Sequence, residues 1–284
     1  MNTNQLAYIA NEIRIDIIRM ISNAGSGHPG DSLSCADILT VLFFSGQMKY
    51  DTNDPNDHSF DRFILSKGHA APALYAVYHQ LGWISDNELI TFRRMGSRLQ
   101  GHPDAKYLPP VEVCSGSLGQ GLSIGSGLAL ALKKKCDGKA NEQKRVYVLC
   151  GDGELQEGSN WEAMMFSAHQ RIDNLTLLID LNQLQIDGFV DDVCSLGNLK
   201  EKLLSFGWLV REVDGHSITE IERALVWANV FVGAPHAIIF HTVKGKGISF
   251  MENQRVWHGK APSVEERDIA MKELFLHRNM LLAR

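Results

Sequence analysis

The chain has 284 residues, of which 44% are hydrophobic and 21% charged, and its formal net charge is −5 at pH 7. This length allows one large domain or two small ones with a substantial core, and the composition excludes disordered and fibrous proteins. The densest basic run is three lysines, at residues 133–135, so nucleic acid is not an expected partner.

The first predicted element is an amphipathic helix. Apolar residues recur at helical spacing from Leu6 to Met20, and the helix is expected to end near residues 23–25. It also contains four charged residues, Glu12, Arg14, Asp16 and Arg19. They exclude a signal-peptide core, and no uncharged apolar run approaches the ~20 residues of a membrane span. Five scattered cysteines without a C-x-x-C pair argue against a disulfide framework, so the cytoplasm is the expected location.

Helices and loops are predicted to continue through the first third of the chain. A Gly/Ser/His loop at residues 25–30 precedes a second apolar helix over residues 33–44. A short buried strand is predicted at residues 62–66 and a helix at residues 70–81. Residues 93–113 are expected to be irregular.

From Ser115 onward the pattern changes to alternating helices and strands. A glycine-rich helix is predicted over residues 118–134. The predicted strands, rich in Val, Ile and Leu, lie at residues 146–150, 175–180, 208–213 and 237–241. The predicted helices between them lie at residues 159–169, 198–206 and 218–227. This order indicates an α/β fold, a parallel sheet with helices on both faces. Without an internal repeat or linker, residues 1–284 are expected to form a single domain.

Two polar side chains follow predicted strands at the edge where such sheets bind ligands. Asp152 lies between two glycines after the strand that ends at Cys150, and Asn182 follows the strand that ends at Asp180. Carboxylate and amide oxygens suit Mg²⁺, which commonly shares its coordination with substrate phosphates. Taken alone, Gly-Asp-Gly is more often a turn in which the aspartate caps a helix. Its pairing with Asn182 favours a magnesium site.

Several motifs resemble those of transketolases, which use thiamine diphosphate. The sequence GDGELQEG at residues 151–158, followed by IDLNQLQIDG at residues 179–188, resembles the family's cofactor signature. Four histidine settings match as well: SGHPG at His28, SKGHA at His69, GHP at His102 and WHG at His258. GSLGQG at residues 116–121 and KGKG at residues 244–247 complete a match that runs in the family's order from residue 25 to residue 259.

The resemblance implies roles for particular residues of a thiamine-diphosphate-binding fold. The implied Mg²⁺ ligands are Asp152, Asn182 and the backbone carbonyl of Leu184. The residues implied to bind the cofactor are His69, Gly116, Ser117, Leu118, Gly153, Glu157, Asn182, Lys244 and His258. Catalytic roles are implied for His28, His102 and His258, because histidines suit hydrogen bonding to sugar hydroxyls and proton transfer near neutral pH.

Glu157 has two interpretations. By itself it is a first-turn helix glutamate that is favourable to the helix dipole. The resemblance instead places it at a two-fold interface, where it connects the two active sites of a dimer. Two copies of this chain and two partner chains, a heterotetramer, are then expected.

The resemblance covers only the diphosphate-binding half of a transketolase. In that family a second domain supplies the glutamate that contacts the cofactor's pyrimidine ring, and this chain stops at Arg284. It therefore resembles the first subunit of a split transketolase, active only with a C-terminal-half subunit. The implied reaction, in carbohydrate metabolism, transfers a two-carbon ketol unit from a ketose phosphate to an aldose phosphate.

Two other functions remain open from the sequence. A deoxyxylulose-phosphate-synthase-like or 2-oxo-acid-dehydrogenase-like half shares the Mg²⁺ motif, but the SGHPG and WHG histidines favour transketolase. A non-catalytic cofactor-binding remnant would not be expected to retain all of these residues.

One residue departs from the resemblance. Asp31 stands where many transketolases carry a small residue. An acidic group there is expected to repel an anionic substrate or to bind an extra hydroxyl, unless it is simply a helix N-cap ahead of Leu33.

Overall fold

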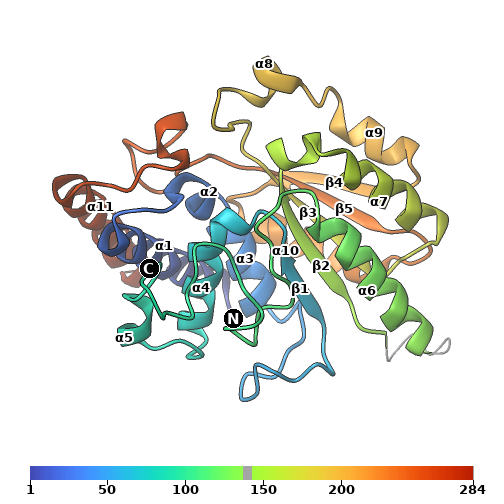
Figure 1. The fold of residues 1–284 in the computed structure, drawn as a ribbon, viewed down its shortest axis with the longest axis horizontal. Coiled ribbons are helices and arrows are strands. Elements are labelled where there is room, and N and C mark those ends of the chain that lie inside the picture. Colours follow the sequence, from blue (N-terminus) through green and yellow to red (C-terminus); the bar gives the residue numbers. More distant parts are fainter. Residues whose placement is uncertain (137–142, 284) are drawn as a thin grey trace.

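The computed structural model describes residues 1–136 and 143–283 and has a five-stranded parallel sheet at its centre (Figure 1). The strands are β1 (Arg62–Leu65), β2 (Val146–Gly151), β3 (Leu175–Leu181), β4 (Leu209–Asp214) and β5 (His236–His241). Their spatial order is β1-β2-β3-β5-β4, and all four pairings are parallel. The α/β fold class is therefore confirmed.

The central strands are buried because both faces of the sheet are covered. In β2, Tyr147 and Leu149 pack into one core, whereas Val146 and Val148 pack into the other. Successive side chains of a strand point to opposite faces, so a strand between two helical layers must be apolar at every position. This explains the uninterrupted Val/Ile/Leu runs of the sequence.

Five helices belong to the layer around the larger core: α1 (Thr3–Ala24), α3 (Ala36–Phe44), α4 (Ala71–Gln80), α10 (Ile218–Val230) and α11 (Val264–Leu282). Helix α1 lies against α3, α4 and α11. A capping box of Asn2 and Gln5 begins α1, and Gly25, with a φ of 66°, ends it.

The opposite face carries α6 (Gly121–Lys135), α7 (Gly158–His169) and α9 (Leu199–Ser205), which lie together on the right of Figure 1. Shorter elements line the site or the periphery. They are α2 (Pro29–Ser34), α5 (Asp86–Leu89), α8 (Val190–Cys194) and the 3₁₀ turns η1 (Gly68–Ala70), η3 (Gly153–Gln156) and η4 (Arg255–His258).

Two predicted helices differ from the structure. The single helix expected over residues 33–44 is two helices, α2 and α3, because Cys35 between them leaves helical geometry with a φ of −93° and a ψ of 4°. The helix expected from residue 118 begins at Gly121, since Gly119 has a φ of 83°. As predicted, residues 93–113 contain no helix or strand. Among the described residues, no helix has both the length and the apolar character needed to cross a bilayer.

We predict that Gly125→Ala lowers the free energy of unfolding by about 1–3 kcal/mol. A Cβ on Gly125 would lie 2.5 Å from Cγ2 of Val148, where α6 packs against β2. The matched control is Gly127→Ala on the exposed side of α6, where a Cβ would meet nothing within 4 Å. That change should be neutral or stabilising by up to about 1 kcal/mol. Urea denaturation of the two variants compares them, and equal effects would contradict the packing explanation.

Candidate functional site

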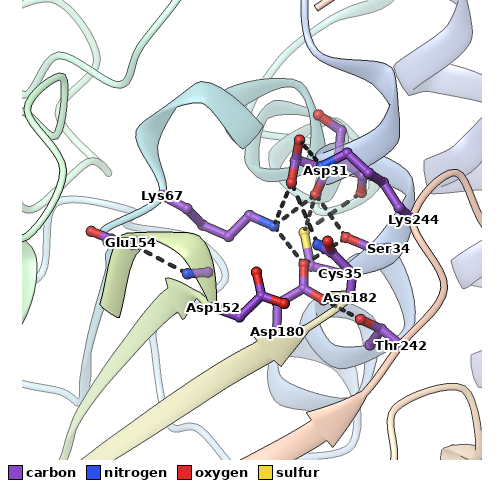
Figure 2. Close-up of polar contacts among 12 residues, drawn as sticks. Asp31, Ser34, Cys35, Lys67, Asp152, Glu154, Asp180, Asn182, Thr242 and Lys244 are labelled. Atoms are coloured by element: carbon purple, nitrogen blue, oxygen red, sulfur yellow. Dashed lines mark hydrogen bonds and ion pairs between the residues drawn. The ribbon is translucent and has the colours of Figure 1, made fainter. Parts of the chain in front are cut away.

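The carboxyl ends of four strands bring three predicted residues, together with Lys67, to one edge of the sheet (Figure 2). Lys67 follows β1, Asp152 follows β2, Asn182 follows β3 and Lys244 follows β5. A cavity of about 370 Å³ opens at this edge. It is lined by His28, Asp31, His69, His102, Gly116, Leu118, Gly151, Asp152, Gly153, Glu154, Gln156, Glu157, Leu184, Gln185, Ile186, Asp187 and His258.

Asp152 presents a buried carboxylate with no cationic hydrogen-bond partner. Its Oδ1 accepts a hydrogen bond from the Gly153 amide at 2.7 Å and its Oδ2 accepts one from the Gln183 amide. Burial, followed by the charge of Asp180, raises the pKa of Asp152 to about 7. A carboxylate in this condition gains from a nearby cation, so the residue fits a metal ligand.

Asn182 and Leu184 offer the neutral oxygens of the same candidate metal site. The amide of Leu184 donates to Oδ1 of Asn182 at 3.1 Å, which fixes the direction of that side chain. The carbonyl of Leu184 accepts a hydrogen bond from Lys244 at 3.1 Å. The structure therefore orients one amide oxygen and one carbonyl beside Asp152, the donor set expected for Mg²⁺.

A fully buried ion pair lies beneath these residues. Nζ of Lys67 is 2.5 Å from Oδ2 of Asp180, and both side chains are inaccessible to solvent. Asp180 also accepts hydrogen bonds from the hydroxyls of Ser34 and Thr242. Burial acts to lower the pKa of Lys67, but its buried neighbours, Asp180 foremost and then Cys35 and Asp31, together outweigh burial and the pKa is raised. The pair joins α2, β1, β3 and the segment after β5.

Asp31 is the second anion of this cluster. Nζ of Lys244 lies 2.6 Å from its Oδ2, and Nδ1 of His258 lies 3.0 Å from the same oxygen. Nε2 of His69 and Nζ of Lys67 approach Oδ1 at 3.7 and 3.8 Å. Burial works to raise the pKa of Asp31, but the two lysines hold it well below its ordinary value. Asp31 is thus a buried, ionised carboxylate.

The capping interpretation of Asp31 is wrong. The N-cap position of α2 is His28, and Asp31 lies inside the helix with its side chain turned toward Lys244. Only 4% of Asp31 is exposed, although it lines the cavity. Pro29 at the first helical position begins the helix and needs no side-chain cap.

Three predicted histidines form a triangle in the cavity. The ring centroids of His28, His69 and His258 lie 5.3 to 5.5 Å apart. Burial, with the neighbouring rings of His69 and His258, lowers the pKa of His28 to about 3. Burial also lowers the pKa of His69, and it does the same for His102 together with Arg93. His28, His69 and His102 are therefore neutral near pH 7, each with one nitrogen that can accept a proton or hydrogen bond.

The segment that carries Lys244 is held by contacts that the sequence did not predict. The Val243 amide donates to Nε2 of His216 at 2.8 Å, while Nδ1 of His216 faces Asp37 at the same distance. Arg14 binds Asp37 through both terminal nitrogens and donates from Nε to the Lys246 carbonyl. Because Nε2 of His216 accepts the hydrogen bond from Val243, the neutral ring carries its proton on Nδ1. Together these contacts fix the backbone on both sides of Lys244.

Glu154 was also missed as a site residue. Its carboxylate accepts hydrogen bonds from the Ser66 hydroxyl, the Gly119 amide at 2.9 Å and the Gly151 amide at 3.1 Å. It therefore ties the loop at residues 116–121 to the ends of β1 and β2. The only signal in the sequence was its place as the fourth residue of the GDGE motif.

Most, but not all, of the residues implied by resemblance line the cavity. Asn182 and Lys244 lie just outside it, 4% and 0% exposed, and reach it through their contacts with Asp31. Ser117 is exposed and does not line the cavity. Glu157 is exposed at the N-cap position of α7 without capping it, so it is not a first-turn residue.

The donor set of the cavity fits a metal-bound diphosphate. Buried polar atoms without a hydrogen-bond partner include Nε2 of His69 and Oγ of Ser115. Such groups are costly unless a ligand or water satisfies them. The lining described above contains five acidic residues and neither lysine nor arginine. A diphosphate bound here would therefore need a cation to offset these carboxylates.

Comparison with known proteins gives one family across the chain. The family model described as "Transketolase, thiamine diphosphate binding domain" matches residues 6–278. The chain is 38% identical over 275 residues to one of the subunits of the apulose-4-phosphate transketolase of Phocaeicola vulgatus, with 96% of this chain and 95% of that protein covered. It is 39% identical over 269 residues to "6-deoxy-6-sulfo-D-fructose transketolase subunit SqwG" of a Clostridium species, covering 95% and 96%.

Longer relatives match over only part of their length. Human transketolase is 43% identical over 251 residues, which is 88% of this chain but 39% of that protein. The crystal structure of transketolase from Campylobacter jejuni superposes with a TM-score of 0.90 at 35% identity, covering 97% of this chain and 43% of the other. The chain thus spans nearly all of the subunit relatives and less than half of the longer ones.

Proposed function

The chain belongs to the transketolase family, as its thiamine-diphosphate-binding domain, and from this premise we propose that it is the diphosphate-binding subunit of a two-chain transketolase. Thiamine diphosphate and Mg²⁺ are the proposed cofactors. The proposed reaction moves a two-carbon ketol unit from a ketose phosphate to an aldose phosphate. A single domain over residues 1–284 and a cytoplasmic location are parts of the same proposal.

One observation carries the proposal. Asp152, Asn182 and the Leu184 carbonyl converge beside a cavity in which burial holds His28 and His102 neutral. The first group would hold Mg²⁺ and the diphosphate, with Gly116, Leu118 and Gly153 close to it. The two histidines would face the sugar. The SGHPG and WHG histidines, His28 and His258, argue against a deoxyxylulose-phosphate-synthase-like or 2-oxo-acid-dehydrogenase-like half.

Each residue type has a defined task in this scheme. Thiamine diphosphate, when bound, supplies the electron sink for breaking a carbon–carbon bond next to a carbonyl. His28 and His102 would hold the hydroxyls of the reacting sugar and exchange protons with them, because neutral imidazoles can both accept and donate. His69 and His258, which both line the cavity, would lie on its cofactor side. Lys244 would add positive charge near the diphosphate.

The charge of the cavity supports the need for a partner. The lining has no lysine or arginine to bind the phosphate of a sugar phosphate. A phosphate is normally held by such side chains or by backbone amides at a helix end. We therefore propose that the C-terminal-half subunit supplies these contacts, together with the glutamate that faces the cofactor's pyrimidine ring.

The test is reconstitution. The purified chain should show no measurable turnover of xylulose 5-phosphate and ribose 5-phosphate with thiamine diphosphate and Mg²⁺. Addition of the matching C-terminal-half subunit should restore it, because only the pair encloses the cofactor. A coupled assay for the released triose phosphate measures turnover by the chain alone and by the chain with its partner subunit. Robust turnover by the chain alone would refute the two-chain proposal, and inactivity of the pair would refute the activity.

The assembly is proposed to contain two copies of each chain. Glu157 is exposed and lines the cavity, and helices α6 and α7 carry the exposed apolar side chains of Ile124, Met165 and Phe166. Such a surface fits a two-fold contact between like halves. Light scattering of the reconstituted enzyme should give the mass of four chains, and Glu157→Lys should reduce it to one pair. A fully active one-to-one dimer would rule out this role of Glu157.

A further inference from the structure

Lys244 is the buried cation that connects the segment after β5 to the proposed metal site. Its Nζ lies 2.6 Å from Oδ2 of Asp31 and donates to the carbonyl of Leu184 at 3.1 Å. The residue is completely buried, so water cannot replace either contact if the backbone shifts. The position of the Lys244 backbone therefore decides whether both contacts are made.

The segment at residues 242–247 contains no helix or strand, so individual contacts fix its backbone. The amide of Val243 donates to Nε2 of His216 at 2.8 Å. The carbonyl of Lys246 accepts a hydrogen bond from Nε of Arg14 at 3.1 Å. One side chain thus holds the segment on each side of the lysine between these two residues.

Asp37 joins the two side chains that hold the segment. Both terminal nitrogens of Arg14 bind its carboxylate, and Nδ1 of His216 lies 2.8 Å from its Oδ2. The side chains of Arg14, Asp37 and His216 are 6%, 9% and 13% exposed. Burial works to raise the pKa of Asp37, but Arg14 and His216 lower it to about 2. The carboxylate therefore stays ionised, and the imidazole keeps a fixed acceptor for its Nδ1 proton.

The loop that carries His216 packs closely on the same segment. A Cβ on Gly215 would lie 2.4 Å from Cγ2 of Thr242, so the approach requires glycine. The Gly215 amide also donates to the His241 carbonyl at 2.9 Å. His216 itself does not line the cavity. Any influence of His216 on a ligand in the cavity must therefore act through the backbone that it holds.

We propose that His216 is a positioning residue for the metal and cofactor site, and that its hydrogen bond from Val243 places Lys244 for its two contacts. This inference rests on the proposed function. A shift of Lys244 would leave the Leu184 carbonyl without this donor and Asp31 without its closest cation. Removal of an outer contact of this kind commonly costs about 10–100-fold in metal affinity.

Two neutral amides at position 216 separate the two hydrogen bonds of the ring. The amide of asparagine is carried by Cγ, as Nδ1 is, so His216→Asn can keep the contact with Asp37 but does not reach Val243. The amide of glutamine lies one bond further out, near the place of Nε2, so His216→Gln can keep the contact with Val243. Asp37 retains Arg14 in both variants, so no buried carboxylate is left without its cation.

The measurement is the dissociation constant of thiamine diphosphate from the reconstituted complex at a fixed Mg²⁺ concentration, by isothermal titration calorimetry. It should rise at least about tenfold in His216→Asn and stay within about threefold of the wild type in His216→Gln. The matched control is His241→Asn, at an exposed histidine that ends β5, which should change the constant less than about twofold. Equal losses in both His216 variants would indicate a purely structural role and overturn the inference, as would unchanged binding in both.

Amide hydrogen exchange of the full chain without cofactor tests the positioning directly. Peptides that cover residues 242–247 should exchange at least about tenfold faster in His216→Asn than in the wild type, and His216→Gln should restore the protection. Unchanged exchange in His216→Asn would overturn the inference even if cofactor binding weakened. Failure of the wild-type complex to bind thiamine diphosphate with Mg²⁺ would instead contradict the proposed function, and the exchange rates would still decide whether His216 holds the segment.

Discussion

Asp152→Ala should reduce the cofactor-dependent activity of the assembled enzyme at least about a hundredfold at limiting Mg²⁺. The change removes the only carboxylate of the proposed donor set and leaves the neutral oxygens of Asn182 and Leu184. The fold should persist, because Asp152 makes hydrogen bonds only to nearby backbone amides. Initial rates across a Mg²⁺ titration give the result, and circular dichroism checks the fold. Normal activity at limiting Mg²⁺ would remove Asp152 from the metal site.

The same residue makes the stability of the metal-free chain depend on pH. Burial raises the pKa of Asp152 from 3.8 to about 7, so between these values the folded chain holds a proton that the unfolded chain has released. The stability that the protonated carboxyl contributes is therefore fully present below pH 3.8, the ordinary pKa, and is lost as the pH rises through about 7. Across this pH range, the free energy of unfolding of the wild type should fall by on the order of 4 kcal/mol relative to that of Asp152→Asn. Added Mg²⁺ should restore it, and a difference that stays constant with pH would contradict this explanation.

Lys67→Met should lower the free energy of unfolding by about 3–5 kcal/mol. It leaves Asp180 buried without its cation and removes one of the two lysines beside Asp31. The matched control is Lys133→Met, which breaks a 2.8 Å contact with Asp173 at a site where 33% of the lysine side chain is exposed. That loss should not exceed about 1 kcal/mol. Urea denaturation compares the two, and similar losses would show that burial does not set the cost.

The sheet was predictable because its central strands β2, β3 and β5 consist mostly of buried apolar residues. Each predicted strand lies within one residue of an observed one, since a Val/Ile/Leu run between turn residues has few other structures open to it. The long helix α11 was not predicted. Only Ala270, Leu274 and Leu281 of α11 are buried, so its apolar period is too weak to stand out from the polar residues around it.

The polar residues of the site were predictable only where a motif surrounds them. Asp152, Asn182 and the histidines stand in recognisable runs, and the structure brings most of them to one cavity. Lys67 and Asp180 are 113 positions apart and look like an exposed loop lysine and a strand-end aspartate. Their pairing depends on the neighbouring ends of β1, β2 and β3, which a local pattern cannot specify. The capping prediction for Asp31 was wrong for the same reason. The partners of Asp31 lie at residues 67, 69, 244 and 258, which are distant in the sequence.

The strand order has a consequence for the newly made chain. β5 is the last strand to be synthesised, yet it lies between β3 and β4. Until the ribosome has released residues 236–241, the edge of β3 and the whole of β4 lack the neighbour that will satisfy their backbone groups. Unpaired edges of this kind favour association with other chains. Completion of the sheet must therefore wait for translation to pass β5, and a chaperone that shields β3 during that interval would improve the yield of folded chain.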